Sequence, residues 1–194
     1  MVTGRRAALR AALLPVTVLW ILVVPTPVRA DLRIGNLEVF LNDYDVTVHV
    51  VLFGAIPESL LESLHTGIPA QVRLRVELWQ YNRFLPDRRT QSRNVDRQIS
   101  YNVLTKEYKV VSVKAEHREP YLTKDLREAQ RVISEFRIGN LIPAAQLDPK
   151  ELYYVRVQSI VSLGGVNSWF ARFTGDAEQT DWIRSSLLTL TRSQ

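Results

Sequence analysis

The hydrophobic residues of this chain recur mostly at every second position, which is the spacing of half-buried β-strands. The clearest example runs from Val72 to Trp79, where valine and leucine alternate with arginine, glutamate and tryptophan. Such a strand places one apolar face on a core and one charged face in water. Between Val46 and Phe53 both faces are largely apolar, which predicts a strand in the middle of its sheet. The pattern predicts further strands at residues 32–41, 98–103, 108–113, 152–161, 169–173 and 182–190.

Two segments carry the signals of short helices. The first, residues 57–64, begins with a proline and acidic residues, and Gly67 can end it in the left-handed conformation. The second, residues 123–136, begins with Thr123 as a possible cap and repeats its apolar residues at helical spacing up to Phe136. Seven or eight strands with mostly short connections and only two short helices favour an antiparallel β-sandwich of the immunoglobulin-like type over a parallel α/β sheet.

One pentapeptide, Arg-Ile-Gly-Asn-Leu, occurs twice, at residues 33–37 and 137–141. Five residues with unmatched flanks do not establish a duplication. We interpret the repeat either as coincidence or as a shared strand-with-bulge geometry, because glycine inside a strand often marks a bulge.

Residues 1–30 have the organisation of a secretory signal peptide. Three arginines precede a mainly apolar run at residues 11–24, and Val28-Arg29-Ala30 predicts cleavage before Asp31. Fourteen residues of helix span about 21 Å, which is short of the roughly 30 Å of a bilayer core. We therefore expect cleavage rather than anchoring, export in the unfolded state, and a single periplasmic or extracellular domain, residues 31–194, without a transmembrane segment.

Charge and composition remove several classes of function. The chain has 194 residues and a formal charge of +5, but four of its 25 basic residues and none of its 20 acidic residues lie in the leader, so the mature domain carries +1. A binding site for nucleic acid is therefore not predicted. The absence of cysteine excludes disulfides, thiolate metal sites and cysteine nucleophiles.

No motif in the sequence indicates a reaction. His49, His65 and His117 lie far apart, without the spacing of a metal site, so no metal or cofactor is predicted. The GxSxG, SxxK and P-loop patterns are missing. Carboxylates such as Glu77 and Asp96 are present, but no spacing singles out a catalytic pair.

The candidate contact residues fall between Trp79 and Arg97. Five arginines stand close to one another here, and guanidinium groups suit phosphate and carboxylate, so they could contact anionic head groups or an acidic partner. The alternative is a solvated loop between strands. Three aromatic residues at strand spacing could form a stacking platform for a glycan or peptide, or could belong to the core. The candidates are Trp79, Tyr81, Arg83, Phe84, Arg88, Arg89, Arg93 and Arg97.

Four stretches of the chain carry a resemblance to a known family. They are residues 63–69 continuing into 72–79, residues 100–108, residues 122–136 and residues 152–157. In these stretches the chain resembles a family of exported bacterial proteins that is catalogued as a domain of unknown function. The resemblance implies an envelope protein, often encoded beside a membrane sensor kinase, and it assigns no catalytic residue.

Together these patterns predict an exported, non-catalytic protein that binds a component of the cell envelope, with a membrane protein as one possible partner. One alternative is a carbohydrate-binding module that uses the row Trp79, Tyr81 and Phe84. A second alternative is a hydrolase, in which a histidine would meet a nucleophile and a carboxylate.

Overall fold

The computed structural model describes residues 31–41, 44–164 and 177–189. The expected leader, at residues 1–30, and the expected strand at residues 169–173 lie outside this part. Within the described residues the elements are β1 (Arg33–Leu41), β2 (Val46–Phe53), α1 (Glu58–His65), β3 (Ala70–Tyr81), β4 (Arg88–Asn102), β5 (Glu107–Lys114), β6 (Tyr121–Thr123), α2 (Leu126–Ser134), β7 (Glu135–Ile138), the 3-10 helix η1 (Ala144–Gln146), β8 (Leu152–Leu163), β9 (Ala177–Gln179) and β10 (Ile183–Arg184).

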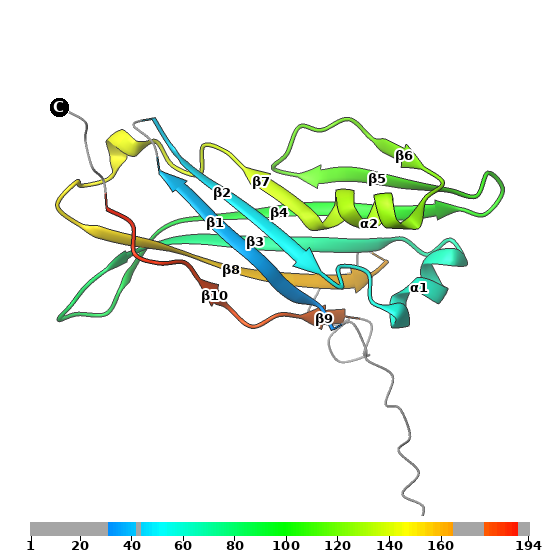
Figure 1. Cartoon of the computed structure of the whole chain (residues 1–194), viewed down its shortest axis with the longest axis horizontal. Coiled ribbons are helices and arrows are strands. Elements are labelled where there is room, and N and C mark those ends of the chain that lie inside the picture. The colour runs from blue at the N-terminus through cyan, green and yellow to red at the C-terminus, as the bar shows by residue number, and fades with distance from the viewer. Residues whose placement is uncertain (1–30, 42–43, 165–176, 190–194) are drawn as a thin grey trace, which may run out of the picture.

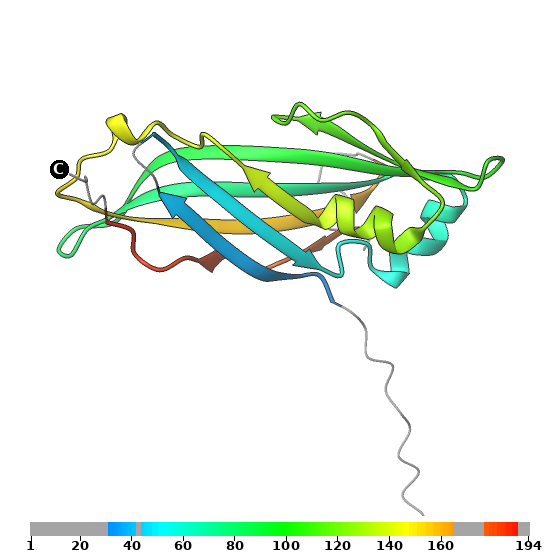
Figure 2. The same cartoon turned by 45° about the horizontal axis from the view of Figure 1, so that its top comes forward.

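The strands form two antiparallel sheets. The smaller sheet has the order β1-β2-β7, and the larger has the order β10-β8-β3-β4-β5-β6, with β9 also paired to β8. Strands β3 to β6 follow one another as a meander, in which the expected strands at residues 98–103 and 108–113 pair as the β4–β5 hairpin. Figures 1 and 2 show β1, β2 and β7 crossing obliquely over one face of the long strands β3, β4 and β8. For the part of the chain that the structure describes, the predicted mainly β, antiparallel fold with two α-helices is confirmed.

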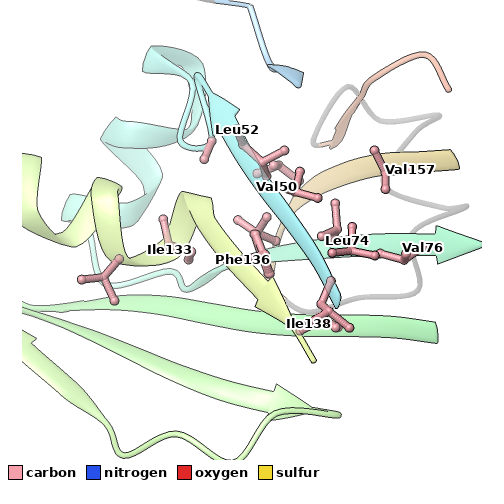
Figure 3. Close-up of a cluster of buried hydrophobic side chains, with 14 of the residues drawn as sticks. Val50, Leu52, Leu74, Val76, Ile133, Phe136, Ile138 and Val157 are labelled. Atoms are coloured by element: carbon pink, nitrogen blue, oxygen red, sulfur yellow. The ribbon is translucent and has the colours of Figure 1, made fainter. Parts of the chain in front are cut away.

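The core lies between the two sheets. Every second residue of β3, from Val72 to Leu78, is completely buried, as are Val48 and Val50 of β2 and Phe136 of β7. Figure 3 shows side chains of β2, β3, β7, β8 and α2 converging in this space. Because full burial of one such side chain contributes about 1.5–3 kcal/mol, this cluster contributes strongly to the stability of the fold. The central position predicted for residues 46–53 is confirmed, since β2 has a partner on each side.

The arginine-rich segment is a strand, so the alternative of a solvated loop is wrong for most of it. Strand β4 begins at Arg88, has 15 residues, and pairs with β3 almost along its entire length. A bulge between Leu78 and Trp79 shifts the register near the start of the pairing. Backbone hydrogen bonds to β3 hold this segment as a strand although its own residues are largely polar.

The second helix is shorter than the predicted range of 123–136. It runs from Leu126 to Ser134, and its N-cap is Asp125, whose side chain accepts a hydrogen bond from the backbone of Arg127. Thr123 belongs instead to β6. Phe136 follows the helix directly in β7 and is buried in the core. Phe136 fits the helical spacing of the preceding apolar residues only by coincidence, because the backbone is already extended at Glu135.

The first helix matches its prediction within one residue, and Gly67 takes the positive φ of 96° that ends it. Both α-helices are short, at 8 and 9 residues. Among the described residues no helix combines the length and the apolar character needed to span a bilayer.

The repeated pentapeptide takes two different structures. Its first copy lies in β1, where the pairing with β2 is irregular between Ile34 and Asn36, so the expected bulge falls at Gly35. The second copy crosses the end of β7, and Gly139 lies just beyond the strand. The shared sequence does not reflect a shared geometry.

Candidate functional site

The tip of the β3–β4 hairpin presents two large apolar side chains to solvent. Phe84 is 87% exposed and Leu85 is 69% exposed. Figure 1 shows this hairpin at one extreme end of the long sheet. Exposure alone does not distinguish this tip, because Val103 and Leu104 on the β4–β5 turn are also exposed. The aromatic ring of Phe84 and the neighbouring arginines distinguish it, since aromatic and arginine side chains dominate protein interfaces.

Hydrogen bonds within the tip hold its backbone in place. The side-chain oxygen of Asn82 accepts hydrogen bonds from the backbone amides of Phe84 and Leu85, both at 3.0 Å. The backbone amide of Asn82 in turn donates to Asp87 over 2.9 Å. Asn and Asp side chains commonly stabilise turns in this way. The tip is therefore an ordered turn between two long strands.

A contact from β8 fixes the tip to the sheet. The hydroxyl of Tyr154 donates to the second carboxylate oxygen of Asp87 over 2.8 Å. The hydrogen bond from the Asn82 backbone, followed by the bond from Tyr154, lowers the pKa of Asp87. Both carboxylate oxygens of Asp87 therefore bind groups of the protein itself. The ring of Tyr154 is also in contact with Arg184, whose guanidinium carbon lies 4.3 Å from the ring centre.

Three of the predicted arginines surround or support this tip. Arg83 lies over the ring of Phe84, with 5.7 Å between its guanidinium carbon and the ring centre. Arg88 donates twice to the side chain of Gln80. Arg89 donates to the buried carboxylate of Glu77 over 3.2 Å. Among the described residues neither Arg83 nor Arg88 pairs with a carboxylate, so both keep their positive charge at the tip, whereas Arg89 binds the buried carboxylate of Glu77.

The other two predicted arginines lie elsewhere, facing the smaller sheet. Arg93 donates to the backbone carbonyls of Gly139 and Asn140. Arg97 is 1% exposed and binds Glu116 through two short hydrogen bonds, so its place in a surface contact is wrong. The five arginines lie on different faces because successive residues of a strand point to opposite sides of the sheet. Arg89 and Arg93 are four residues apart and would share a face in a regular strand, but the bulge opposite Leu78 and Trp79 places them on opposite faces.

The three aromatic candidates do not form one row. Trp79 and Tyr81 belong to β3, but Phe84 lies in the tip beyond it. Trp79 is half-buried: its indole nitrogen donates to Glu77 over 2.9 Å, and Arg156 lies 4.2 Å from its ring centre. The same guanidinium group lies 4.5 Å from the ring centre of Trp182. Trp79 thus forms part of a network on the outer face of the larger sheet.

Glu77 is the centre of that network. It is buried, and it accepts hydrogen bonds from Arg156, Trp79 and Arg89. Burial opposes its ionisation, but the hydrogen bonds from Arg156 and Trp79 outweigh this effect and lower its pKa. The expectation that this face of β3 lies in water is therefore wrong at Glu77. Sequence reasoning missed Arg156, because only the register between β3 and β8 brings it beside Glu77. It also missed Trp182, which contacts Arg156 from a distant segment of the chain.

The two histidines that make contacts have separate surroundings. His49 lies between Glu38 and Glu135, at 3.6 and 3.4 Å. The Nε2 atom of His65 lies 2.6 Å from the hydroxyl of Tyr108. In the part of the chain that the structure describes, no three histidine or carboxylate side chains are grouped as a metal site.

Comparison with known proteins identifies the family. No curated protein and no solved structure shows significant similarity to the chain. A family model described as "Domain of unknown function (DUF4390)" matches residues 29–183, which include all but a few of the described residues. The implied resemblance to a domain-of-unknown-function family is confirmed, and the chain belongs to the DUF4390 family.

Proposed function

We propose that this chain is an exported, non-catalytic binding protein of the cell envelope, built as a β-sandwich, and that it docks onto a protein partner through the tip of the β3–β4 hairpin. The observation that carries the proposal is the exposure of the aromatic ring of Phe84 beside Leu85, between Arg83 and Arg88, on a turn that is held by hydrogen bonds. Export rests on the signal-peptide pattern of residues 1–30.

An ordered tip is well suited to binding. A flexible loop loses conformational entropy when it binds, whereas a turn already held by hydrogen bonds loses little. Buried aromatic and arginine side chains are typical of the residues that dominate protein interfaces. Phe84 would enter an apolar pocket of the partner, and Leu85 would extend the same contact.

The charges around the tip indicate the chemistry of the partner. Arg83 and Arg88 flank the apolar pair, and the nearest acid, Asp87, is already bound by Tyr154 and the backbone. The tip therefore presents positive charge around an apolar centre. We infer a partner surface with an apolar pocket and an acidic rim, since complementary charge guides association.

The alternatives receive less support from the geometry. A sugar stacks on the face of an aromatic ring, but Arg156 already lies over the rings of Trp79 and Trp182. For the hydrolase alternative, His49 and His65 contact carboxylates and a tyrosine hydroxyl rather than a serine or threonine.

Site-specific photo-crosslinking in intact cells tests the proposal. A photoreactive amino acid is placed at position 84 of the full chain and, as a matched control, at position 104, which is 93% exposed on the turn at the other end of β4. We expect position 84 to crosslink one specific envelope protein and position 104 not to do so. Crosslinking from position 104 alone, or to lipid alone from position 84, would contradict a protein partner at this tip.

A pair of double variants tests the energetic role of the apolar residues. Changing Phe84→Ser and Leu85→Ser together should abolish co-purification of the crosslinked partner, while Val103→Ser and Leu104→Ser should leave it unchanged. Both pairs are exposed, so neither change should alter the free energy of unfolding by more than about 0.5 kcal/mol. Co-purification that survives the first double variant would overturn the assignment.

A further inference from the structure

A cavity lies near α2, away from the β3–β4 hairpin. It has a volume of about 260 Å³ and is bounded by the β5–β6 connection, the last turn of α2 and the first residues of β7. In Figure 1 these elements lie toward the opposite end of the long sheet from the β3–β4 tip. Four arginines contribute to its lining: Arg97, Arg118, Arg131 and Arg137.

The inner wall of the cavity is rigid. Arg97 binds both carboxylate oxygens of Glu116, at 2.7 and 2.6 Å, and donates to the backbone carbonyls of Val132 and Glu135. The guanidinium group also lies 4.1 Å from the ring centre of Phe136. Since these bonds use nearly all of its donors, Arg97 shapes the cavity and cannot be its main ligand-binding group.

The remaining three arginines are exposed around the cavity. Within the described residues, Arg118, Arg131 and Arg137 form no ion pair with a carboxylate. Glu135 also lines the cavity, but its carboxylate lies 3.4 Å from His49. The donors that face the cavity are therefore free to bind a ligand that supplies acceptors.

The charge of the lining indicates the ligand. Four arginines and two glutamates leave a formal charge of +2 in a small, polar space with one apolar residue, Val132. A phosphate monoester carries about −1.5 to −2 at neutral pH and offers three acceptor oxygens, whereas a carboxylate carries only −1. Arginine is also the side chain best matched to phosphate geometry.

We infer that this cavity binds the phosphate group of a small phosphorylated ligand, with Arg118, Arg131 and Arg137 as the binding residues. The volume lies just below the range of pockets for drug-sized ligands, about 300–1,000 Å³. The cavity therefore accepts a phosphate with a small attached group. That group can come from a soluble ester or from the head of a phospholipid. This site is separate from the docking tip and does not depend on the proposed function.

Calorimetric titration of the full-length protein tests the inference. Glycerol phosphate is the soluble probe, and glycerol at equal ionic strength is the reference. We expect saturable binding to glycerol phosphate at millimolar or lower concentration. Each variant removes one charge-assisted hydrogen bond to the phosphate. Arg131→Gln and Arg137→Gln should therefore each raise the Kd for glycerol phosphate about tenfold.

The matched control is Arg127→Gln, because Arg127 is exposed on the same helix but does not line the cavity. It should leave the Kd unchanged. If Arg127→Gln weakened the binding of glycerol phosphate equally, the ligand would be responding to positive charge in general, and the site would be overturned. An absence of saturable binding to the unchanged protein would overturn it as well. All three arginines are exposed, so circular dichroism should confirm that the variants fold.

Vesicle sedimentation distinguishes the two sources of phosphate. Vesicles of phosphatidic acid in phosphatidylcholine are compared with vesicles of phosphatidylcholine alone. If the protein sediments only with vesicles that contain phosphatidic acid, and Arg131→Gln abolishes this, the ligand is a lipid head group. If the protein binds glycerol phosphate but not these vesicles, the ligand is a soluble phosphate ester. Crosslinking at position 84 does not involve this cavity. A negative crosslinking result therefore does not affect the phosphate site, and a negative binding result does not affect the docking tip.

Discussion

Glu116 is a partly buried carboxylate whose ionisation depends on Arg97. Burial opposes ionisation of Glu116, but its hydrogen bonds with Arg97 and Ser112 and the nearby charge of Arg118 lower its pKa below the ordinary value. In the unfolded chain the pKa returns to about 4.3. A group with a lowered folded pKa stabilises the fold above its unfolded pKa, and this contribution is lost as the pH falls toward the folded pKa.

We therefore predict that acid destabilises the protein in a way that depends on Glu116. The free energy of unfolding should be nearly constant between pH 7 and about 5, and should fall steeply below about pH 4.3. The variant Glu116→Gln should be less stable at pH 7 and should lose less stability between pH 5 and 3. Urea unfolding followed by circular dichroism measures both values. An identical pH dependence in both proteins would contradict the role of this pair.

Glu77 offers a second test at the same scale. Replacing it with alanine removes the acceptor for Arg156, Trp79 and Arg89 on the outer face of the larger sheet. Because hydrogen bonds to charged groups contribute more than neutral ones, Glu77→Ala should lower the free energy of unfolding by about 2 kcal/mol. Glu62→Ala, at an exposed position of α1, should change it by less than about 0.5 kcal/mol. Chemical denaturation of the two variants checks this, and equal stability would be the contrary result.

Among the elements, the two copies of the pentapeptide form a natural matched pair. A Cβ atom added at Gly35 would lie 2.3 Å from the ring of Phe53, whereas one added at Gly139 would have nothing within 4 Å. Gly35→Ala must therefore displace Phe53 and its contact with Arg33.

We predict that Gly35→Ala lowers the free energy of unfolding by about 0.5–1 kcal/mol, because the ring of Phe53 can move aside but then loses its contact with Arg33. Gly139→Ala should be neutral within about 0.5 kcal/mol. Thermal and urea unfolding of the two variants measures the difference. Equal effects would mean that Phe53, which is about half exposed, moves aside without cost.

The accuracy of sequence-based prediction differs between elements for physical reasons. The alternation in β2 and β3 identified both strands, because every second residue is buried in the core. In β4, arginines occupy positions that elsewhere carry apolar residues, so its start was missed. The alternation of Val95, Arg97 and Ile99 was nevertheless a signal that Arg97 faces inward.

For the candidate site, the sequence indicated the region but not its arrangement. Phe84, Arg83 and Arg88 were identified as contact candidates, and they do surround the tip. Leu85 was missed, although Asn82 and Pro86 are turn residues that predict an exposed segment. The link from Tyr154 to Asp87 and the phosphate cavity both depend on contacts between distant segments, which no local pattern reveals.

At the scale of the whole molecule, two arginines of β4 connect the sheets. Arg97 binds carbonyls at the end of α2 and the start of β7, and Arg93 binds carbonyls just beyond β7. Arg97 is buried and Glu116 is partly buried, so removing Arg97 leaves the carboxylate with Ser112 as its remaining donor. It also removes the guanidinium group that donates to the carbonyls of Val132 and Glu135.

We predict that Arg97→Ala lowers the free energy of unfolding by about 3–5 kcal/mol, since it breaks a buried ion pair. Arg93→Ala, at a more exposed position, should lower it by about 1 kcal/mol. If Arg97→Ala is too unstable to purify, Arg97→Lys should give an intermediate loss, because lysine keeps the charge but not the forked donors. Urea unfolding measures the three variants, and a similar effect of Arg93→Ala and Arg97→Ala would contradict this ranking.

The strand order β1-β2-β7 also determines when the smaller sheet can form. The β1–β2 hairpin is close in sequence, but the second partner of β2 begins only at Glu135, after β3 to β6 and α2. While a chain emerges from its N-terminus, β2 therefore has an unpaired edge and an apolar face without cover. Such edges promote aggregation. Because β7 ends at Ile138, the smaller sheet can be completed only after at least the first 138 residues have been released.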